Sequence, residues 1–204
     1  MNAGASAAAQ AAVVGRGRWW QRALAAAGYV TPDLAQARRR AGCWEAGAEG
    51  ERRTAALLAQ LDAHGWRGGH DLAIPGASKA NADHLVWAPS GRAFMVDSKL
   101  WHRRARVRPV GGRLAHGTQD RDRQIDTALY EARLLGRALG VPVQPVIAVH
   151  NAPVEAGGFH LRGVTVVPAD RLVPLLLANA GTPNPVRAGE VLERAGQVLR
   201  QYRQ

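Results

Sequence analysis

The sequence predicts an α/β or α+β fold in which helices flank a mixed central β-sheet. The hydrophobic patterns run in the order helix, several strands, helix, strand and helices, which is typical of such a layered fold. The segment Pro89-Ser90-Gly91 separates two apolar stretches and indicates a hairpin. A long helical pattern that ends at Gly140 is followed by an apolar, β-branched stretch that suits a buried strand.

The composition is strongly basic and rich in arginine. The chain has 204 residues, enough for one domain plus an appendage, with 27 Lys and Arg against 16 Asp and Glu. Only Lys79 and Lys99 are lysines, and the arginine fork matches phosphate oxygens. A GC-rich genome also favours arginine, so composition alone leaves nucleic-acid binding open. The single cysteine, Cys43, excludes an intramolecular disulfide and a cysteine-based zinc site.

No part of the sequence has the pattern of a membrane span or a secretory signal. No apolar run reaches the roughly 18 residues that a transmembrane helix needs. The alanine-rich start lacks a basic region followed by a hydrophobic core. We therefore expect a soluble, cytoplasmic protein.

Residues 1–44 are expected to be an N-terminal appendage, partly helical or disordered, and residues 45–204 the main domain. The first twelve residues are small and of low complexity. Short helices are predicted at residues 19–27 and 34–41, with Pro32 at a first helical position.

The main domain begins with an amphipathic helix at residues 49–64 and a short strand at residues 70–74. Residues 82–88 and 92–100 then form the two strands of the hairpin. The remaining elements are an extended stretch at 107–115 that turns at Gly111-Gly112, a helix at 120–139, a strand at 143–149, an extended stretch at 159–167 broken at Gly163, and helices at 169–179 and 186–202.

The hairpin brings charged residues together. Side chains alternate along a strand, so Asp97 and Lys99 project from one face. If the hairpin is centred on Ser90, Asp83 faces Asp97 with Cβ atoms about 5 Å apart. His84 then points away from Asp83, and we interpret it as structural. A slip of one residue would send Asp83 to the other face.

Two carboxylates opposite one another destabilise a sheet unless one is protonated or a cation lies between them. A divalent ion such as Mg²⁺ suits paired carboxylates and water. Two structural alternatives remain: Asp83 caps a turn after Asn81, and Asp97 with Lys99 forms an ordinary ion pair.

Three ordered motifs, at residues 50–54 (GERRT), 81–86 (NADHLV) and 96–101 (VDSKLW), resemble the nuclease-related domain (NERD) family. This family belongs to the PD-(D/E)xK nuclease superfamily, so the resemblance implies a restriction-endonuclease-like core and makes residues 45–204 a nuclease-like domain. The resemblance covers residues 47–149. One departure is that His102 and Arg103 follow Trp101, where the family often has a glycine.

The resemblance implies a metal site for Mg²⁺ or Mn²⁺. Asp83 and Asp97 would be ligands, assisted by the backbone carbonyl of Ser98. Lys99 would stabilise the transition state or orient the attacking water. Glu51, from the first helix, would be a further catalytic carboxylate and metal ligand.

Two of the implied residues have equally good structural interpretations. Glu51 lies near a helix N-terminus, where the macrodipole favours an acid in any case. Gln124 shares a helical face with Ala128 and Leu135, and many superfamily members carry a glutamine on the equivalent helix. The alternative for Gln124 is an inward amide that bonds the backbone.

Arginines concentrate after the DxK motif, where a loop would flank the site and hold the phosphate backbone. The alternative is a solvated basic loop. The expected nucleic-acid-binding residues are Arg103, Arg104, Arg106, Arg108, Arg113, Arg121 and Arg123.

The sequence thus predicts a metal-dependent endonuclease that hydrolyses DNA phosphodiester bonds. The alternative is a catalytically inactive DNA-binding or scaffold module with the same fold. A basic protein of ribosome or RNA assembly would show no convergence of the acids. We expect DNA as the partner and no membrane; the oligomeric state, including a homodimer, stays open.

Overall fold

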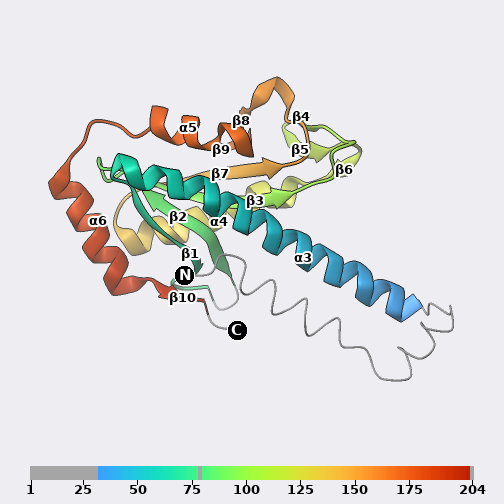
Figure 1. The fold of residues 1–204 in the computed structure, drawn as a ribbon, viewed down its shortest axis with the longest axis horizontal. Coiled ribbons are helices and arrows are strands. Elements are labelled where there is room, and N and C mark those ends of the chain that lie inside the picture. Colours follow the sequence, from blue (N-terminus) through green and yellow to red (C-terminus); the bar gives the residue numbers. More distant parts are fainter. Residues whose placement is uncertain (1–31, 78–79, 203–204) are drawn as a thin grey trace.

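The computed structural model describes residues 32–77 and 80–202, which form a mixed α/β fold (Figure 1). The main sheet has seven strands in the order β10-β1-β2-β3-β7-β9-β8, and a second sheet has the order β4-β5-β6. The strands are β1 (Arg67–Ala73), β2 (Asn81–Trp87), β3 (Ala93–Leu100), β4 (Val107–Val110), β5 (Arg113–His116), β6 (Gln119–Asp120), β7 (Val143–His150), β8 (Phe159–Leu161), β9 (Val164–Pro168) and β10 (Arg200–Gln201).

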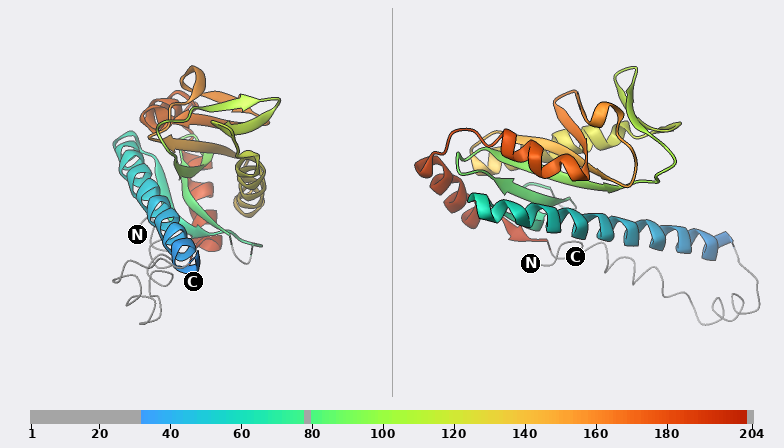
Figure 2. Two further views of the ribbon diagram at one scale, coloured as in Figure 1. Left: turned by 90° about the vertical axis from the view of Figure 1, so that its right-hand side faces the viewer. Right: turned by 45° about the horizontal axis from the view of Figure 1, so that its top comes forward.

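Helices cover both faces of the main sheet (Figure 2). They are α3 (Pro32–Leu58) with its 3-10 extension η1 (Ala59–His64), η2 (Glu155–Gly157), α4 (Asp122–Leu139), η3 (Ala169–Arg171), α5 (Leu172–Ala178) and α6 (Pro185–Val198). The sheet is mixed because β7 runs parallel to both β3 and β9, while the other pairs are antiparallel. The predicted fold class is therefore confirmed.

Each face of the sheet has its own apolar core. On one face, Phe94 and Val96 of β3 pack with Leu58 of α3 and with Leu172 and Leu176 of α5. On the other face, the alternating residues of β3 pack against α4 and α6; this core includes Met95, Ile125, Leu135 and Val191. Burial of this apolar area is the main force that holds the layers together. Successive residues of β3 therefore serve opposite faces.

The predicted hairpin and its register are confirmed. Leu85 pairs with Met95 and Trp87 with Ala93. The turn closes through a hydrogen bond from the Gly91 N–H to the Ala88 carbonyl (2.8 Å), with Gly91 at φ 79°. A glycine adopts this left-handed conformation without strain.

The prediction of two separate helices at residues 34–41 and 49–64 is wrong, because α3 runs unbroken from Pro32 to Leu58. Glycines in a helix interior cost about 1 kcal/mol each but do not end it when packing continues. At Gly50, an added Cβ atom would lie at van der Waals distance, 3.4 Å, from the Leu100 Cβ, so α3 packs against β3 at this position. The predicted helix at residues 19–27 lies outside the described residues.

The C-terminal prediction also needs correction. The helix expected at residues 186–202 ends at Val198, and Leu199 is already extended (φ −89°, ψ 142°). Gln201 then pairs with Leu72, so β10 covers the edge of β1. No glycine or proline follows Val198 in the sequence, so the sequence gives no signal for the end of this helix.

The other predicted strands and the long helix are confirmed within two or three residues, and η3 with α5 takes the place of the helix predicted at residues 169–179. Among the described residues, every helix is too short or too polar to cross a membrane.

Candidate active site

The hairpin brings Asp83, Asp97 and Lys99 to one end of the central sheet. The antiparallel ladder runs to the His84–Val96 pair, and the two aspartates follow at the next position of each strand. The Ser98 N–H donates to Asp83 Oδ2 (2.9 Å), and Lys99 Nζ donates to Asp97 Oδ1 (2.5 Å). The side chains of Lys99 and Asp97 are 22% and 15% exposed, so this ion pair is largely withdrawn from water.

Charges in this cluster perturb one another. Burial, followed by the nearby Asp97 charge, raises the pKa of Asp83 well above its usual range, and the Glu51 carboxylate adds to the rise. Burial alone would lower the pKa of Lys99, but Asp97 and Asp83 outweigh it, so that this pKa is raised. The lysine therefore stays protonated, while the acids hold more negative charge than a buried site readily accommodates.

A cavity of about 1300 Å³ opens over these residues. Asp83, Ser98 and Lys99 line it from the sheet, and Glu51 lines it from α3. Glu51 is 8% exposed and interacts with Asp83 electrostatically. The first-helix acid that the family resemblance singled out therefore lines the same cavity as Asp83.

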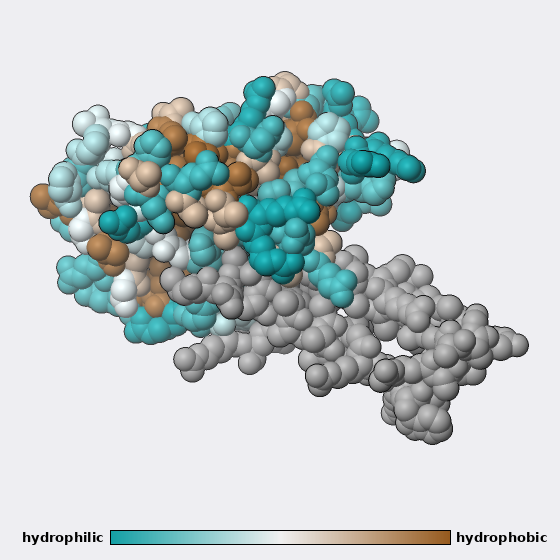
Figure 3. Space-filling view, in the orientation of Figure 1, coloured by the Kyte–Doolittle hydropathy of each residue, from teal (hydrophilic) through white to brown (hydrophobic). Residues whose placement is uncertain are grey.

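Arginines line the same cavity from the β4–β6 side. Arg104, Arg106, Arg108 and Arg121 contribute to its wall, and the first three are exposed. Strand β4, which carries Arg108 and directly follows Arg106, is anchored by a hydrogen bond from the Val107 N–H to the Pro153 carbonyl (2.8 Å). Figure 3 shows that hydrophilic residues predominate at this end of the drawn face. We call the residues Glu51, Asp83, Ser98 and Lys99 the floor of the cavity and the four arginines its wall. The floor is acidic apart from Ser98 and Lys99, and the wall is basic.

The model of the family described as nuclease-related domain matches residues 46–150 of the chain. The chain belongs to the nuclease-related domain (NERD) family. Searches of curated proteins and of solved structures gave no match. The NERD match ends at the last residue of β7 and includes every lining residue of the cavity except Glu155. Membership indicates a nuclease-related function.

Three of the predicted arginines are not among the described lining residues of the NERD cavity. Arg113 forms ion pairs with Asp120 (2.6 Å) and Asp122 (4.0 Å), so acids already engage its guanidinium. Arg103 and Arg123 are exposed outside the lining set. The predicted arginines that line the cavity are therefore Arg104, Arg106, Arg108 and Arg121.

Gln124 also lies outside the set of described residues that line the cavity. It is half-buried in the first turn of α4, where its backbone N–H donates to the Arg121 carbonyl (2.9 Å). The predicted inward orientation of Gln124 is therefore correct in that the residue is half-buried, but Gln124 is not among the described residues that line the cavity.

Two turns further along α4, Glu131 interacts with the site electrostatically. Burial, followed by the Asp97 charge, raises its pKa to about 7, and Lys99 partly opposes the rise. The sequence analysis missed this acid, although a signal was present. Glu131 lies three residues after Ala128 and four before Leu135, so it occupies the buried helical stripe.

Glu131→Gln should stabilise the domain, and more so at high pH. Below the unfolded pKa both states are protonated and ionisation contributes nothing. As the pH rises from 4.5 through about 7, the unfolded state ionises first and wild-type stability falls. Because one pKa unit is worth about 1.4 kcal/mol, the variant's advantage should grow by about 2–3 kcal/mol between about pH 5 and about pH 8. Urea unfolding at both pH values measures it; an equal advantage at the two pH values would contradict the assignment.

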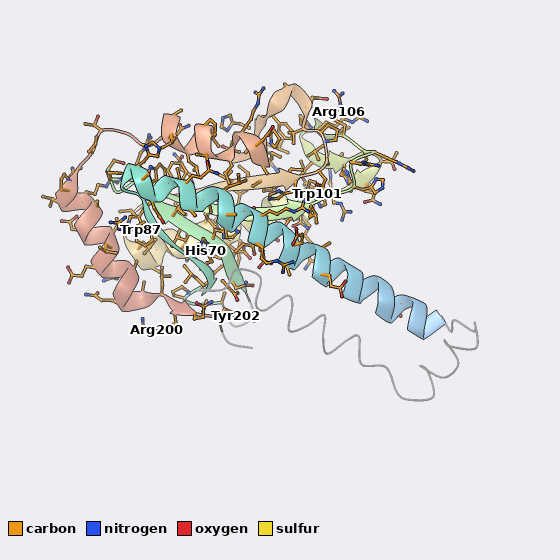
Figure 4. The ribbon with its side chains drawn as sticks, viewed as in Figure 1. His70, Trp87, Trp101, Arg106, Arg200 and Tyr202 are labelled. Atoms are coloured by element: carbon orange, nitrogen blue, oxygen red, sulfur yellow. The ribbon has the colours of Figure 1, made fainter. Side chains whose placement is uncertain are left out.

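A stacked aromatic pair supports the basic wall. Trp101 stacks on His116 (centroids 5.3 Å apart, planes at 18°), and the Arg121 guanidinium lies 5.8 Å from the centre of the Trp101 ring. His116 Nε2 in turn bonds the His102 carbonyl (3.0 Å). Figure 4 shows Trp101 and Arg106 toward the β4–β6 end of the molecule. The aromatic pair holds the guanidinium of Arg121 against the wall.

The chemistry of the donor set fits a hard divalent cation. Asp83 and Glu51 offer carboxylate oxygens to one cavity, and Asp97 lies beside them in an ion pair with Lys99, which also lines it. Burial, followed by the Asp97 charge, raises the Asp83 pKa, which a bound cation would oppose. Among the described residues, no three His, Cys, Asp or Glu side chains are arranged as a ready metal cage. Mg²⁺ retains several waters and needs only one or two carboxylates from the protein, so a complete cage is not required.

Proposed function

We propose that this NERD protein is a metal-dependent nuclease that hydrolyses phosphodiester bonds of DNA. The observation that carries the proposal is the meeting of Asp83, Lys99 and its ion-pair partner Asp97 beside a cavity that Asp83 and Lys99 line and whose wall bears arginines. The arginines of the wall complement the negatively charged phosphate backbone of DNA. Hydrolysis of that backbone requires carboxylates that can hold a metal ion and a cation that stabilises the transition state, and the two aspartates and Lys99 provide these groups. An inactive DNA-binding module would share the wall but would not need the acids.

In this mechanism Asp83 and Asp97 would hold Mg²⁺ or Mn²⁺, with the Ser98 carbonyl and Glu51 as further protein ligands. The ion would supply Lewis acidity for the attack of water on the phosphodiester. Lys99, which the two aspartates keep protonated, stabilises negative charge that develops on the phosphoryl oxygens. The arginine wall holds the flanking phosphates and thereby orients the scissile bond.

The direct test is cleavage of a panel of linear, nicked, branched and single-stranded DNA with Mg²⁺, Mn²⁺ or EDTA. Asp97→Ala purified in parallel controls for contaminating nucleases. Cleavage that requires metal and is absent from the variant supports the proposal. A folded wild type that binds DNA but cleaves none of these substrates would favour the inactive binding module.

The wall makes a separate prediction for binding. Arg104→Glu/Arg106→Glu should weaken DNA binding roughly 100-fold at low salt, because reversing exposed charges removes phosphate contacts and adds repulsion. Fluorescence anisotropy with Ca²⁺ in place of Mg²⁺, at two salt concentrations, measures the loss, which should shrink at high salt.

The matched control is Arg133→Glu/Arg137→Glu, since these exposed arginines line a different cavity near the end of α4. The net charge changes equally in both variants. Equal loss of affinity in the two would show that DNA responds to overall charge and not to the wall.

A further inference from the structure

A continuous chain of hydrogen-bonded polar side chains crosses the α3 face of the sheet. His70 and His84 bond through their Nδ1 atoms (2.7 Å), and His84 Nε2 bonds Ser98 Oγ (3.0 Å). The Ser98 hydroxyl donates to Thr54 Oγ1 (2.9 Å), and Thr54 Oγ1 bonds His150 Nε2 (2.8 Å). The chain joins β1, β2, β3, α3 and β7, and it begins at His70, away from the basic wall (Figure 4).

This chain is deeply buried in an otherwise apolar layer. Thr54 and His84 are 0% exposed, and their neighbours on the same face include Val96 and Ala148. Burying polar groups costs free energy unless every group is paired, and even a satisfied network offers little stability over apolar packing. Such a network can instead fix the geometry of the groups that it joins.

The middle of this hydrogen-bonded chain, at Ser98, adjoins the candidate active site. The side chain of Ser98 joins the chain on the α3 face, while its backbone N–H binds the Asp83 carboxylate. Thr54 lies one helical turn after Glu51, so the two side chains project from neighbouring positions of α3. The Ser98–Thr54 hydrogen bond therefore ties the helix that carries Glu51 to the strand that carries Asp97 and Lys99.

The helix and the strand are in contact at this point. A Cβ added at Gly50 would lie at van der Waals distance from β3, 3.4 Å from the Leu100 Cβ and 3.9 Å from the Ser98 Cβ. Apolar contact alone allows a helix to rotate about its axis, whereas a directional hydrogen bond selects one rotation. The Ser98–Thr54 bond supplies that direction beside the site.

We propose that Thr54 and Ser98 are positioning residues, whose hydrogen bond sets the rotation of α3 and thereby places the Glu51 carboxylate in the metal-binding set. The inference rests on the proposed function, since it assigns Glu51 to the same metal site. Its test nevertheless uses metal binding without DNA, so it can succeed or fail separately from catalysis.

The experiment measures Mn²⁺ affinity of the folded protein by electron paramagnetic resonance of free Mn²⁺. Thr54→Val keeps the shape of the side chain and removes its hydroxyl, so Mn²⁺ should bind roughly tenfold more weakly, as is typical when a group that orients a ligand is lost. Thr54→Ser should restore the affinity. In a Glu51→Gln background, Thr54→Val should cause no further loss, because the carboxylate that it positions is gone.

The matched control is Thr165→Val, which removes a threonine–histidine hydrogen bond (Thr165 Oγ1 to His160 Nδ1, 2.9 Å) between β9 and β8. It should leave Mn²⁺ affinity unchanged. Thermal unfolding of each variant verifies that the protein is folded. If Thr54→Val does not fold, Ser98→Ala removes the same bond from the strand side and should weaken binding to a similar extent, again only when Glu51 is present.

Two results would overturn the inference: wild-type affinity in Thr54→Val, or an equal loss with and without Glu51. Failure of the wild type to bind Mn²⁺ would overturn it as well. A wild type that binds Mn²⁺ but cleaves no DNA would refute the proposed catalysis alone and leave the positioning of Glu51 supported by the double-variant comparison.

Discussion

An Asp97→Asn protein is expected to cleave DNA at least about a thousandfold more slowly than wild type and to bind Mn²⁺ much more weakly. Asparagine keeps the shape of the side chain but removes the negative charge, and with it the ion pair to Lys99 (2.5 Å). Losing this neighbouring charge also lets the pKa of Asp83 fall toward its usual range. Single-turnover cleavage and Mn²⁺ binding measure the two effects.

Asp126→Asn provides the control for this substitution. Asp126 is an exposed acid on α4 that pairs with Arg162 (3.1 Å), and it is not among the described residues lining the cavity. It should cleave and bind Mn²⁺ as the wild type does. If Asp97→Asn retained wild-type Mn²⁺ affinity, Asp97 would not be a ligand, whatever its effect on cleavage.

Lys99→Met should be equally slow in cleavage, again by roughly a thousandfold, but should bind Mn²⁺ at least as tightly as wild type. Methionine fills the volume of the lysine stem without its charge. The lysine now competes with a cation for Asp97 Oδ1, so its removal frees that oxygen and leaves the acids more negative. Substitution of Asp97 should thus weaken Mn²⁺ binding, whereas substitution of its ion-pair partner Lys99 should leave it unchanged or strengthen it.

Arg92→Met is the matched control, since Arg92 is an exposed cation just before β3, at its opposite end, and bonds the Asn179 carbonyl (3.0 Å). It should alter neither property. If Lys99→Met cleaved at more than about one tenth of the wild-type rate, the lysine would serve the fold and not the transition state.

The sequence was sufficient to predict the hairpin because its information is local. Pro89-Ser90-Gly91 fixes the turn, and the alternation of residues along two short strands then fixes which side chains share a face. The positions of Asp83, Asp97 and Lys99 follow from the turn without knowledge of the rest of the chain. Glu51 required the family resemblance, because its place depends on how α3 packs.

What could not be predicted depends on packing between distant segments. The helical position of Glu131 marks it as part of the buried stripe of α4, but Glu131 meets Asp97 and Lys99 only because α4 is laid across β3 and β7. Arg113 carried the same charge as Arg104, but the pairing of β5 with β6 brings Asp120 to it.

The bond between Ser98 and Thr54 has the same origin, since 44 positions separate the two residues. Patterns of one strand or one helix predict which face a residue occupies, but they do not predict which residue of another element it will meet. The buried chain of polar residues was therefore invisible in the sequence, and His84 was recognised only as structural.

Strand β3 has almost no neutral position over the segment from Val96 to Lys99, because both of its faces are committed. Lys99 lines the cavity and pairs with Asp97, while Val96 packs in the core on the α3 side and the Ser98 side chain bonds Thr54 of α3. Most substitutions in this segment should therefore disturb either the cavity or the packing of α3. In an ordinary amphipathic strand, the solvent-facing side tolerates many substitutions. If the proposed catalysis were lost, the Ser98–Thr54 bond between β3 and α3 would still contribute to the fold, so loss of the acids and loss of the fold would leave different patterns of substitution in this segment.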